Sequence, residues 1–395
     1  MTGITFSPYD YRIHEDPFPT YARLRDAAPL YRNEEFDFWA LSRHADVVAA
    51  FRNLEVFSNA NGVSLDPSAY GPHAHRTMSL LATDPPLHTR LRSIVSRTFT
   101  PRRIAALEPR VRAITLEYLE PALEGGSFDL IDDIAGKVPM DVISDLVGVP
   151  HADRAELRRL ADLLIHREEG TFDVTPEGFE AAIALFGYYD ELMRERRATP
   201  RDDLTSELLA ADEGGDRLTD DEIAAFLFLL VVAGNETTTK LLGNAWYWAW
   251  ANPDERAKVF ADRERIHDWV EETLRYDGST QMVLRTVKSP IELHGTELGV
   301  GERVFLLIGS ANRDERVFDR PDDYDLDRVT SDLLAFGSGR HFCLGALLAR
   351  LETRAVLDEL LARVTDYDID ATRAQRVHSA NVRGFAHLPT TVVTR

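Results

Sequence analysis

The chain contains one cysteine, Cys343, and the residues around it suit metal binding. Gly337 and Gly339 precede it, and an apolar segment predicted to be helical starts directly after it at Leu344. A helix there would point its free N–H groups and positive dipole end at the sulfur, which favours the thiolate over the thiol. The glycines permit a tight turn with positive φ, and Phe336 can shield the sulfur from water. The pattern indicates a thiolate ligand for a metal, although a lone cysteine is usually an inert core residue.

A second candidate site lies inside a long apolar run. The run predicts a central, mostly buried helix from about Thr219, a plausible N-terminal cap, to Trp250. Gly234 in its middle costs about 1 kcal/mol relative to alanine, and the polar residues 235–238 follow it. A Thr237 hydroxyl bonded to the Ala233 carbonyl would bend the helix locally and open a groove. The alternative is a polar patch whose hydrogen bonds are satisfied by a neighbouring helix.

The elements that must position these residues are mostly helical. Apolar positions recur at helical spacing in four further segments: Val111–Leu119, Met140–Val147, Gly178–Arg197 and Leu344–Val364. Prolines at 109, 121 and 139 are expected to bound the first two. Strands are expected where β-branched and aromatic residues cluster: Phe36–Leu41, Met282–Val287 and Val304–Ile308. We therefore expect a mainly α fold with a smaller β portion near the amino terminus and in the last third.

Bulk composition excludes several classes of protein. The 395 residues are 44% hydrophobic, with 19 Phe, 12 Tyr and 5 Trp, and they contain no repeat or linker, so a single domain over residues 1–395 is expected. A net charge of −21 argues against nucleic acid as a partner. The first residues have no basic and apolar signal, which favours the cytoplasm. The longest apolar stretch, Ile223–Gly234, is shorter than the roughly 18 residues of a membrane span, so no span is expected.

Four segments, in order, resemble the cytochrome P-450 family. Phe336–Gly345 matches every specified position of the haem-binding loop of its soluble bacterial members, Phe-Gly-x-Gly-x-His-x-Cys-x-Gly. Ala233–Thr238 is similar to the oxygen-activation motif on the family's long central helix, and Glu272–Arg275 to its Glu-x-x-Arg pair. The segment leading to the cysteine loop is also similar, at Ala311–Asp314, Phe318, Pro321, Tyr324 and Arg328. The departures are small: Tyr324 stands where Phe is usual, and Leu333 where many bacterial members carry His.

The resemblance implies haem b (iron protoporphyrin IX) as the cofactor, with Cys343 as the axial ligand of the iron. Haem propionates need hydrogen-bond donors in an apolar pocket. By resemblance, four residues supply them: His88, Arg92, Arg285 and His341. His88 and Arg92 are four residues apart and would share one helical face. Taken singly, each of the four is better explained as a surface residue.

The resemblance further implies a monooxygenase that transfers one atom of dioxygen to a lipophilic small molecule. Thr237 would hydrogen-bond the oxygen, and Glu236, where Asp is also common, would help deliver protons. The pair Glu272 and Arg275 would join Arg328 in a structural network behind the haem. The pair alone is weak support, because Glu156/Arg159 and Glu191/Arg194 have the same spacing. The alternatives are an isomerase, desaturase or peroxide-using haem-thiolate protein, a haem sensor or carrier, and, least favoured, a cysteine hydrolase.

Electrons are expected from separate proteins, a ferredoxin and its reductase, because the chain has no Gly-x-Gly-x-x-Gly nucleotide fingerprint. Residues 85–107 and 338–350 carry several arginines and no acidic residue: Arg90, Arg92, Arg97, Arg102, Arg103, Arg340 and Arg350. By resemblance both segments lie on the cysteine side of the haem. A basic surface there would attract an acidic ferredoxin. The alternative is that these arginines bind propionate or solvate a helix.

Overall fold

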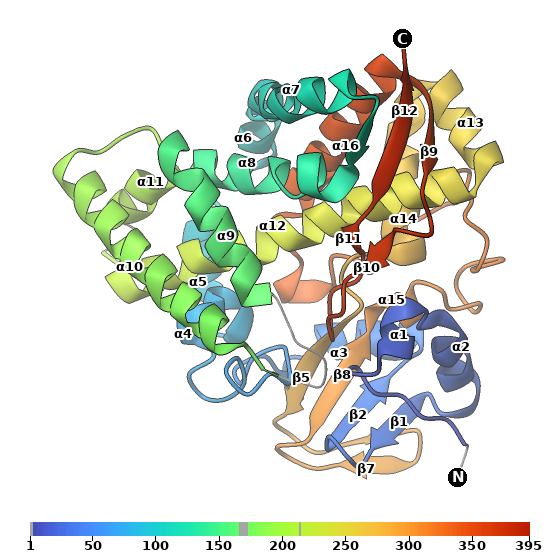
Figure 1. Ribbon diagram of the computed structural model, residues 1–395. Coiled ribbons are helices and arrows are strands. Elements are labelled where there is room, and N and C mark those ends of the chain that lie inside the picture. The colour runs from blue at the N-terminus through green and yellow to red at the C-terminus, as the bar shows by residue number, and fades with distance from the viewer. Residues whose placement is uncertain (1–2, 166–172, 213–214) are drawn as a thin grey trace. The chain divides into compact units, whose positions relative to one another are not determined.

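The structure is a computed structural model that describes residues 3–165, 173–212 and 215–395 (Figure 1). The chain forms two compact units, each built from separate stretches of sequence. The first unit comprises residues 1–57, 108–138 and 237–395, and the second comprises residues 58–107 and 139–236. The single domain expected over residues 1–395 stays a prediction.

A five-stranded mixed sheet forms one part of the first unit (Figure 1), and its strand order is β1-β2-β8-β5-β3. β2 pairs with β8 in parallel, whereas β1 with β2 and β5 with β8 are antiparallel. Helix α3 packs on this sheet and buries Val47 and Phe51 against Leu41, Val304 and Leu306. The bounds are β1 Leu30–Asn33, β2 Phe38–Leu41, α3 His44–Arg52, β3 Phe57–Ser58, β5 Met282–Val287 and β8 Arg303–Leu307.

Three smaller sheets complete the β portion: β4-β12-β9, the hairpin β6-β7, and β10-β11. Their bounds are β4 Ser127–Asp129, β6 Ile291–Leu293, β7 Thr296–Leu298, β9 Val364–Ile369, β10 Gln375–Arg376, β11 Phe385–His387 and β12 Pro389–Thr394. The other helices of the first unit are α1 Tyr11–Glu15, α2 Phe18–Ala27, α7 Glu108–Glu124, the π-helix η2 Ile131–Ala135, α13 Pro253–Ala261, η4 Arg263–Arg265, α14 Ile266–Asp277, α15 Ile308–Ala311, η5 Gly339–His341 and α16 Ala346–Arg363.

The regular elements described in the second unit are helices, apart from Ser58 at the end of β3. Its helices are α4 His75–Met78, η1 Ser79–Ala82, α5 Leu87–Val95, α6 Pro101–Ala106, α8 Val138–Val147, η3 His151–Asp153, α9 Arg154–Ile165, α10 Pro176–Ala198 and α11 Leu204–Ala210. The longest helix, α12 Asp220–Ala251, contributes its first part to this unit and its second part to the first unit. Thr219 caps α12 as predicted: its Oγ1 accepts from the Glu222 N–H at 3.2 Å, while its own N–H donates to Glu222 Oε2 at 2.9 Å.

The mainly α class with a smaller β portion is confirmed, and β5 has its predicted bounds. Other boundaries differ: β2 begins at Phe38 instead of Phe36, and β8 spans Arg303–Leu307 instead of Val304–Ile308. Pro121 does not end α7 but lies within it, because a missing hydrogen bond near the helix end is offset by the packing of α7 on α16. Helix α16 begins at Ala346 instead of Leu344, since a turn intervenes after the cysteine. Only three strands, now β2, β5 and β8, were predicted; the remaining strands were not, and β4 also lies in mid-sequence, outside the regions where strands were expected.

Helix α12 is also long and apolar enough to cross a bilayer, with a mean hydropathy of 1.3 over its most apolar window. The sequence had predicted no such segment, because the continuous apolar stretch is short. In the fold, 67% of that window is buried within the protein. Such burial is typical of a core helix, and the helix is therefore weak support for a membrane span.

Candidate active site

The cysteine loop has the backbone that its glycines were predicted to permit. Gly337 and Gly339 have φ values of +70° and +74°, in the left-handed region that favours glycine. The Cys343 N–H donates to the Phe336 carbonyl at 3.0 Å, which closes the loop on itself. Cys343 is exposed and lies three residues before the first residue of α16. The loop thus presents the thiol at the amino-terminal end of a helix of 18 residues.

Phe51 of α3 supports this loop from outside. A Cβ on Gly337 would lie 3.4 Å from the Phe51 ring, and a Cβ on Gly339 would lie 3.1 Å from the Phe51 carbonyl oxygen. The guanidinium carbon of Arg285 lies 5.3 Å from the centre of the same ring. Phe51 therefore lies next to both Arg285 on β5 and the glycines of the cysteine loop. Sequence reasoning missed Phe51, because no local pattern marks a residue whose partners lie more than 200 positions away.

Arg350 and Glu271 also contact the loop, through Phe336. The Arg350 guanidinium binds both carboxylate oxygens of Glu271, at 2.5 and 2.8 Å, and its central carbon lies 4.4 Å from the Phe336 ring centre. Such stacking fixes the ring that was predicted to shield the sulfur. Arg350, which the sequence placed in a basic surface, thus forms an ion pair with an acid from α14.

The second unit carries two of the predicted propionate ligands. His88 and Arg92 lie one turn apart on α5, as predicted, with His88 buried and Arg92 partly exposed. The other two lie in the first unit. Arg285 on β5 is buried, with its NH1 donating to the Leu284 carbonyl at 2.7 Å, and His341 ends η5, two residues before Cys343.

The middle of α12 shows why a glycine stands there. A Cβ on Gly234 would lie 2.4 Å from Cδ1 of Ile143 on α8, so a larger residue there would require the Ile143 side chain to move. The helix continues without interruption through the motif. Its motif residues differ in exposure: Asn235, Glu236 and Thr238 are buried, whereas Ala233 is exposed and Gly234 and Thr237 are partly exposed. Residues 233, 234 and 237 share one helical face, so this face of α12 is accessible to solvent whereas residues 235, 236 and 238 are buried.

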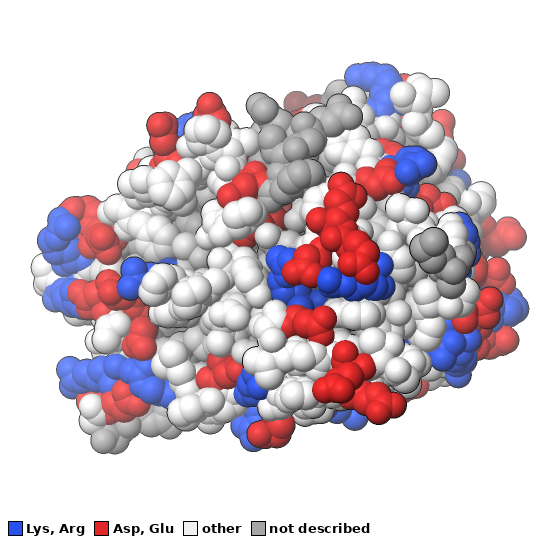
Figure 2. Space-filling view, turned by 90° about the horizontal axis from the view of Figure 1, so that it is seen from below, with Lys and Arg blue, Asp and Glu red and all other residues white. Residues whose placement is uncertain are grey.

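Several arginines of the predicted basic surface have acidic partners from distant sequence. Arg90 binds Asp216 at 2.8 Å and Glu222 at 2.7 Å, and Arg103 binds Glu207. The absence of acids within residues 85–107 was thus a poor guide to local charge. Arg97 and Arg102 are exposed. On the face drawn in Figure 2, basic side chains lie next to acidic ones in small mixed groups.

Comparison with known proteins identifies the family. The family model described as "Cytochrome P450" matches residues 175–365. The chain is 56% identical over 393 residues to "Putative cytochrome P450 123" of Mycobacterium tuberculosis, covering 99% of this chain and 98% of the relative. The chain belongs to the cytochrome P450 family. Its members are monooxygenases, so this P450 is an oxidoreductase.

Solved structures of bacterial P450s share the fold. The cytochrome P450 CYP109Q5 from Chondromyces apiculatus superposes with a TM-score of 0.90 at 32% identity, covering 100% of each chain. CYP109E1 from Bacillus megaterium, solved in complex with corticosterone, gives 0.87 at 32% identity, covering 96% of this chain and 99% of its own. The cytochrome P-450 fold expected from the cysteine loop is therefore confirmed.

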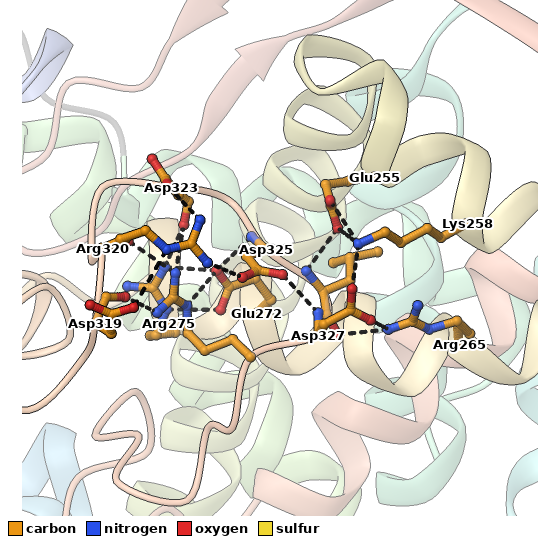
Figure 3. Close-up of polar contacts among 12 residues, drawn as sticks. Glu255, Lys258, Arg265, Glu272, Arg275, Asp319, Arg320, Asp323, Asp325 and Asp327 are labelled. Carbon is orange, nitrogen blue, oxygen red and sulfur yellow. Dashed lines mark hydrogen bonds and ion pairs between the residues drawn. The ribbon is translucent and has the colours of Figure 1, made fainter.

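Within this P450, the Glu272–Arg275 pair has the network that the resemblance predicted (Figure 3). Arg275 donates to both oxygens of Glu272 at 2.7 and 2.8 Å, and Arg328 donates to Glu272 Oε1 at 3.3 Å. Arg275 also donates to three backbone carbonyls, those of Asn312, Pro321 and Asp323. The pair thus fastens α14 to the segment that leads to the cysteine loop.

The P450 family uses a haem-iron cofactor, and the residues present fit such a group. An exposed thiol on a loop that turns at two left-handed glycines offers a soft anionic ligand to iron. The predicted propionate ligands are guanidinium and imidazole groups, which are suitable donors for carboxylates. The accessible face of small residues on α12 leaves room beside an apolar helix.

Proposed function

We propose that this P450 binds haem b, inserts one atom of dioxygen into a lipophilic small molecule by hydroxylation or epoxidation, and receives electrons in the cytoplasm from a ferredoxin and its reductase. The geometry of the cysteine loop is the observation that carries the proposal. CYP109E1, a relative by structure, was solved with the steroid corticosterone, which supports a lipophilic substrate. Bound haem supplies the iron at which dioxygen is activated, so that one oxygen atom enters the substrate and the other leaves as water.

The chain's own residues would bind both the iron and the propionates of the cofactor. The Cys343 thiolate binds the iron, and its position before α16 stabilises the negative sulfur. Four residues donate to the propionates: His88, Arg92, Arg285 and His341. The ring of Phe51 sets the position of Arg285 relative to the loop, because it contacts both.

Proton delivery falls to Glu236 and Thr237. Thr237 lies on the accessible face of α12, so its hydroxyl can hold a proton toward the oxygen, whereas Thr238 and Thr239 are buried. The Thr239 hydroxyl already donates to the Ala135 carbonyl at 2.9 Å. Glu236 is buried beside Thr237 in sequence and can replenish the proton through water.

The ferredoxin surface centres on Arg97 and Arg102, both of which are exposed. The other arginines of the predicted basic surface contribute less net charge where acids neutralise them. Arg90, Arg103 and Arg350 each form an ion pair with a glutamate.

Cys343→Ser tests the proposed function directly. The variant should fold and lose the strongly red-shifted, thiolate-type Soret band of the reduced carbon-monoxide complex, because serine offers no thiolate. Ser338→Ala is the matched control: it removes the hydroxyl that accepts from Arg52 Nε at 3.1 Å but leaves the sulfur, so the band should remain. A thiolate-type band that persisted in Cys343→Ser would exclude Cys343 as the ligand.

Thr237→Ala tests the proton path. The variant should keep substrate binding while releasing more hydrogen peroxide and less product per reductant consumed, roughly 10²-fold less when general-acid help is lost. Thr239→Val is the control, since it removes a structural hydrogen bond two residues away and should lower stability without changing the ratio of product to peroxide. Equal ratios in Thr237→Ala and the unchanged protein would contradict the assignment of Thr237.

A further inference from the structure

Three metal-ligating side chains meet where β4, η2 and β11 come together in the first unit. Asp129 ends β4, Asp132 lies in the first turn of η2, and His387 ends β11. Each offers one ligand atom, and these atoms lie within 4.8 Å of one another. His387 Nδ1 is 3.1 Å from Asp132 Oδ2 and 3.5 Å from Asp129 Oδ2. This cluster combines an imidazole with two carboxylates.

The spacing already matches a coordination sphere. For metal–ligand bonds of about 2.1 Å, a tetrahedral arrangement separates neighbouring ligand atoms by about 3.4 Å. The two distances from His387 fall on either side of that value. A cation could therefore lie between the imidazole and the two carboxylates after small side-chain movements.

Asp129 is held in place by its surroundings. Its carboxylate accepts from the backbone N–H groups of Ile131 at 2.9 Å and Leu388 at 3.1 Å. Asp129 also pairs with Pro389 in the β4–β12 ladder, and Pro389 lies two residues after His387, the last residue of β11. Outer hydrogen bonds of this kind orient carboxylate ligands at metal sites.

The local charge favours a cation. Besides the carboxylates of Asp129 and Asp132, Asp133 adds a third one nearby, and its Oδ2 accepts from the Asp129 N–H at 2.9 Å. Lys137 Nζ lies 3.9 Å from Asp133 Oδ1, on the carboxylate that is not proposed as a ligand. Asp132 and His387 have side-chain exposures of 58% and 45%, so an ion has access from solvent.

We propose that Asp129, Asp132 and His387 bind one divalent first-row transition-metal cation of the Zn²⁺ type, with water completing its coordination. The ion would fasten β11 to β4 and η2 and so hold the carboxyl-terminal strands in place. Imidazole selects such ions over Mg²⁺, which prefers oxygen ligands and retains its waters. This site is separate from the cysteine loop and does not depend on haem.

A second histidine provides a matched comparison. His294 Nε2 lies 2.8 Å from Asp46 Oδ2, an imidazole with one carboxylate partner in place of two. Their side-chain exposures, 30% and 22%, also leave the pair accessible. If a simple histidine–aspartate contact were enough to bind zinc, both places would do so.

The test is calorimetric titration of the full chain, purified with its haem, with ZnCl₂ and separately with MgCl₂. His387→Ala and Asp132→Asn should each lose one zinc-binding event that His294→Ala keeps. Zinc at roughly one hundred times its Kd should raise the Tm by a few degrees in the unchanged protein and in His294→Ala, but not in His387→Ala. Magnesium at the same concentration should show no such event.

Two outcomes would overturn the proposal. One is an unchanged number of zinc ions in folded His387→Ala and Asp132→Asn, which would place the binding elsewhere. The other is a fall in Tm in both variants together with no zinc binding by the unchanged protein, which would show that His387 serves only as an ion-pair partner of the two carboxylates. Two variants are used so that misfolding of one does not decide the test. Asp132 is more exposed than His387, so Asp132→Asn should disturb the fold less.

Discussion

Glu272–Arg275 and Glu156–Arg159 have the same residue types, the same spacing and nearly the same closest contact, at 2.7 and 2.6 Å. Their surroundings are opposite. The side chains of the first pair are 1% and 0% exposed, whereas both of the second are 58% exposed. The buried pair also binds Arg328, the Asp325 N–H and three carbonyls, while the exposed pair links residues within α9. The number of further partners, and not the ion pair itself, distinguishes a structural network from a surface contact.

Glu272→Gln should show the largest effect, because it leaves the buried guanidinium groups of Arg275 and Arg328 without their carboxylate. We expect the free energy of unfolding to fall by about 3 to 5 kcal/mol. Urea unfolding followed by circular dichroism measures this, with Glu156→Gln as the control, expected to change stability by less than about 0.5 kcal/mol. Equal losses of unfolding free energy in Glu272→Gln and Glu156→Gln would show that the buried pair stabilises the fold no more than the exposed pair.

Glu352 sharpens the comparison, because it is as buried as Glu272 but its Oε1 has no hydrogen-bond partner among the described residues. Burial raises the pKa of Glu352 well above 4.5. The unfolded chain therefore loses this proton at a lower pH than the folded one. Between the two pKa values the free energy of unfolding falls as pH rises, by about 1.4 kcal/mol for every tenfold drop in proton concentration.

Glu352→Gln should consequently raise the Tm at pH 7.5, and the gain should disappear as the pH approaches 4.5. Thermal unfolding at a series of pH values measures the difference between variant and unchanged protein. Glu156→Gln again serves as the control, with a small difference at every pH. A Glu352→Gln difference independent of pH would mean that Glu352 ionises alike in the folded and unfolded chain.

Arg159→Ala should have the smallest effect, within about 0.5 kcal/mol, because its ion pair with Glu156 is solvated and screened by salt. Urea unfolding at low and at high salt checks this, and any loss should shrink further at high salt. A loss above 1 kcal/mol, roughly, would show that exposed pairs on this protein contribute more than such pairs usually do.

Local patterns predicted the elements whose determinants are close in sequence. The cap at Thr219, the bounds of β5 and the positive φ of Gly337 and Gly339 follow from neighbouring residues. Arg275 could be placed in a network only through the family resemblance, because its spacing from Glu272 also occurs in exposed pairs.

Contacts between distant segments had no local signal. The partners of Arg90 lie in residues 216–222, and the acid beside Arg350 lies 79 positions earlier. Charge counted along the sequence therefore overestimated the basic surface. The close approach of Gly234 to Ile143 on α8 had no local signal either, because the two residues are 91 positions apart.

The contact between Phe51 and the cysteine loop has a consequence for protein engineering. Gly337 and Gly339 lie close to the ring and the carbonyl of Phe51. Residues 334–345 therefore cannot be exchanged independently of α3. A chimera that receives this loop from a relative inherits a shape made for a particular aromatic residue on α3. Loop exchanges should therefore include residue 51 with the loop, and a donor with a smaller side chain at that position would leave the transplanted turn without its support.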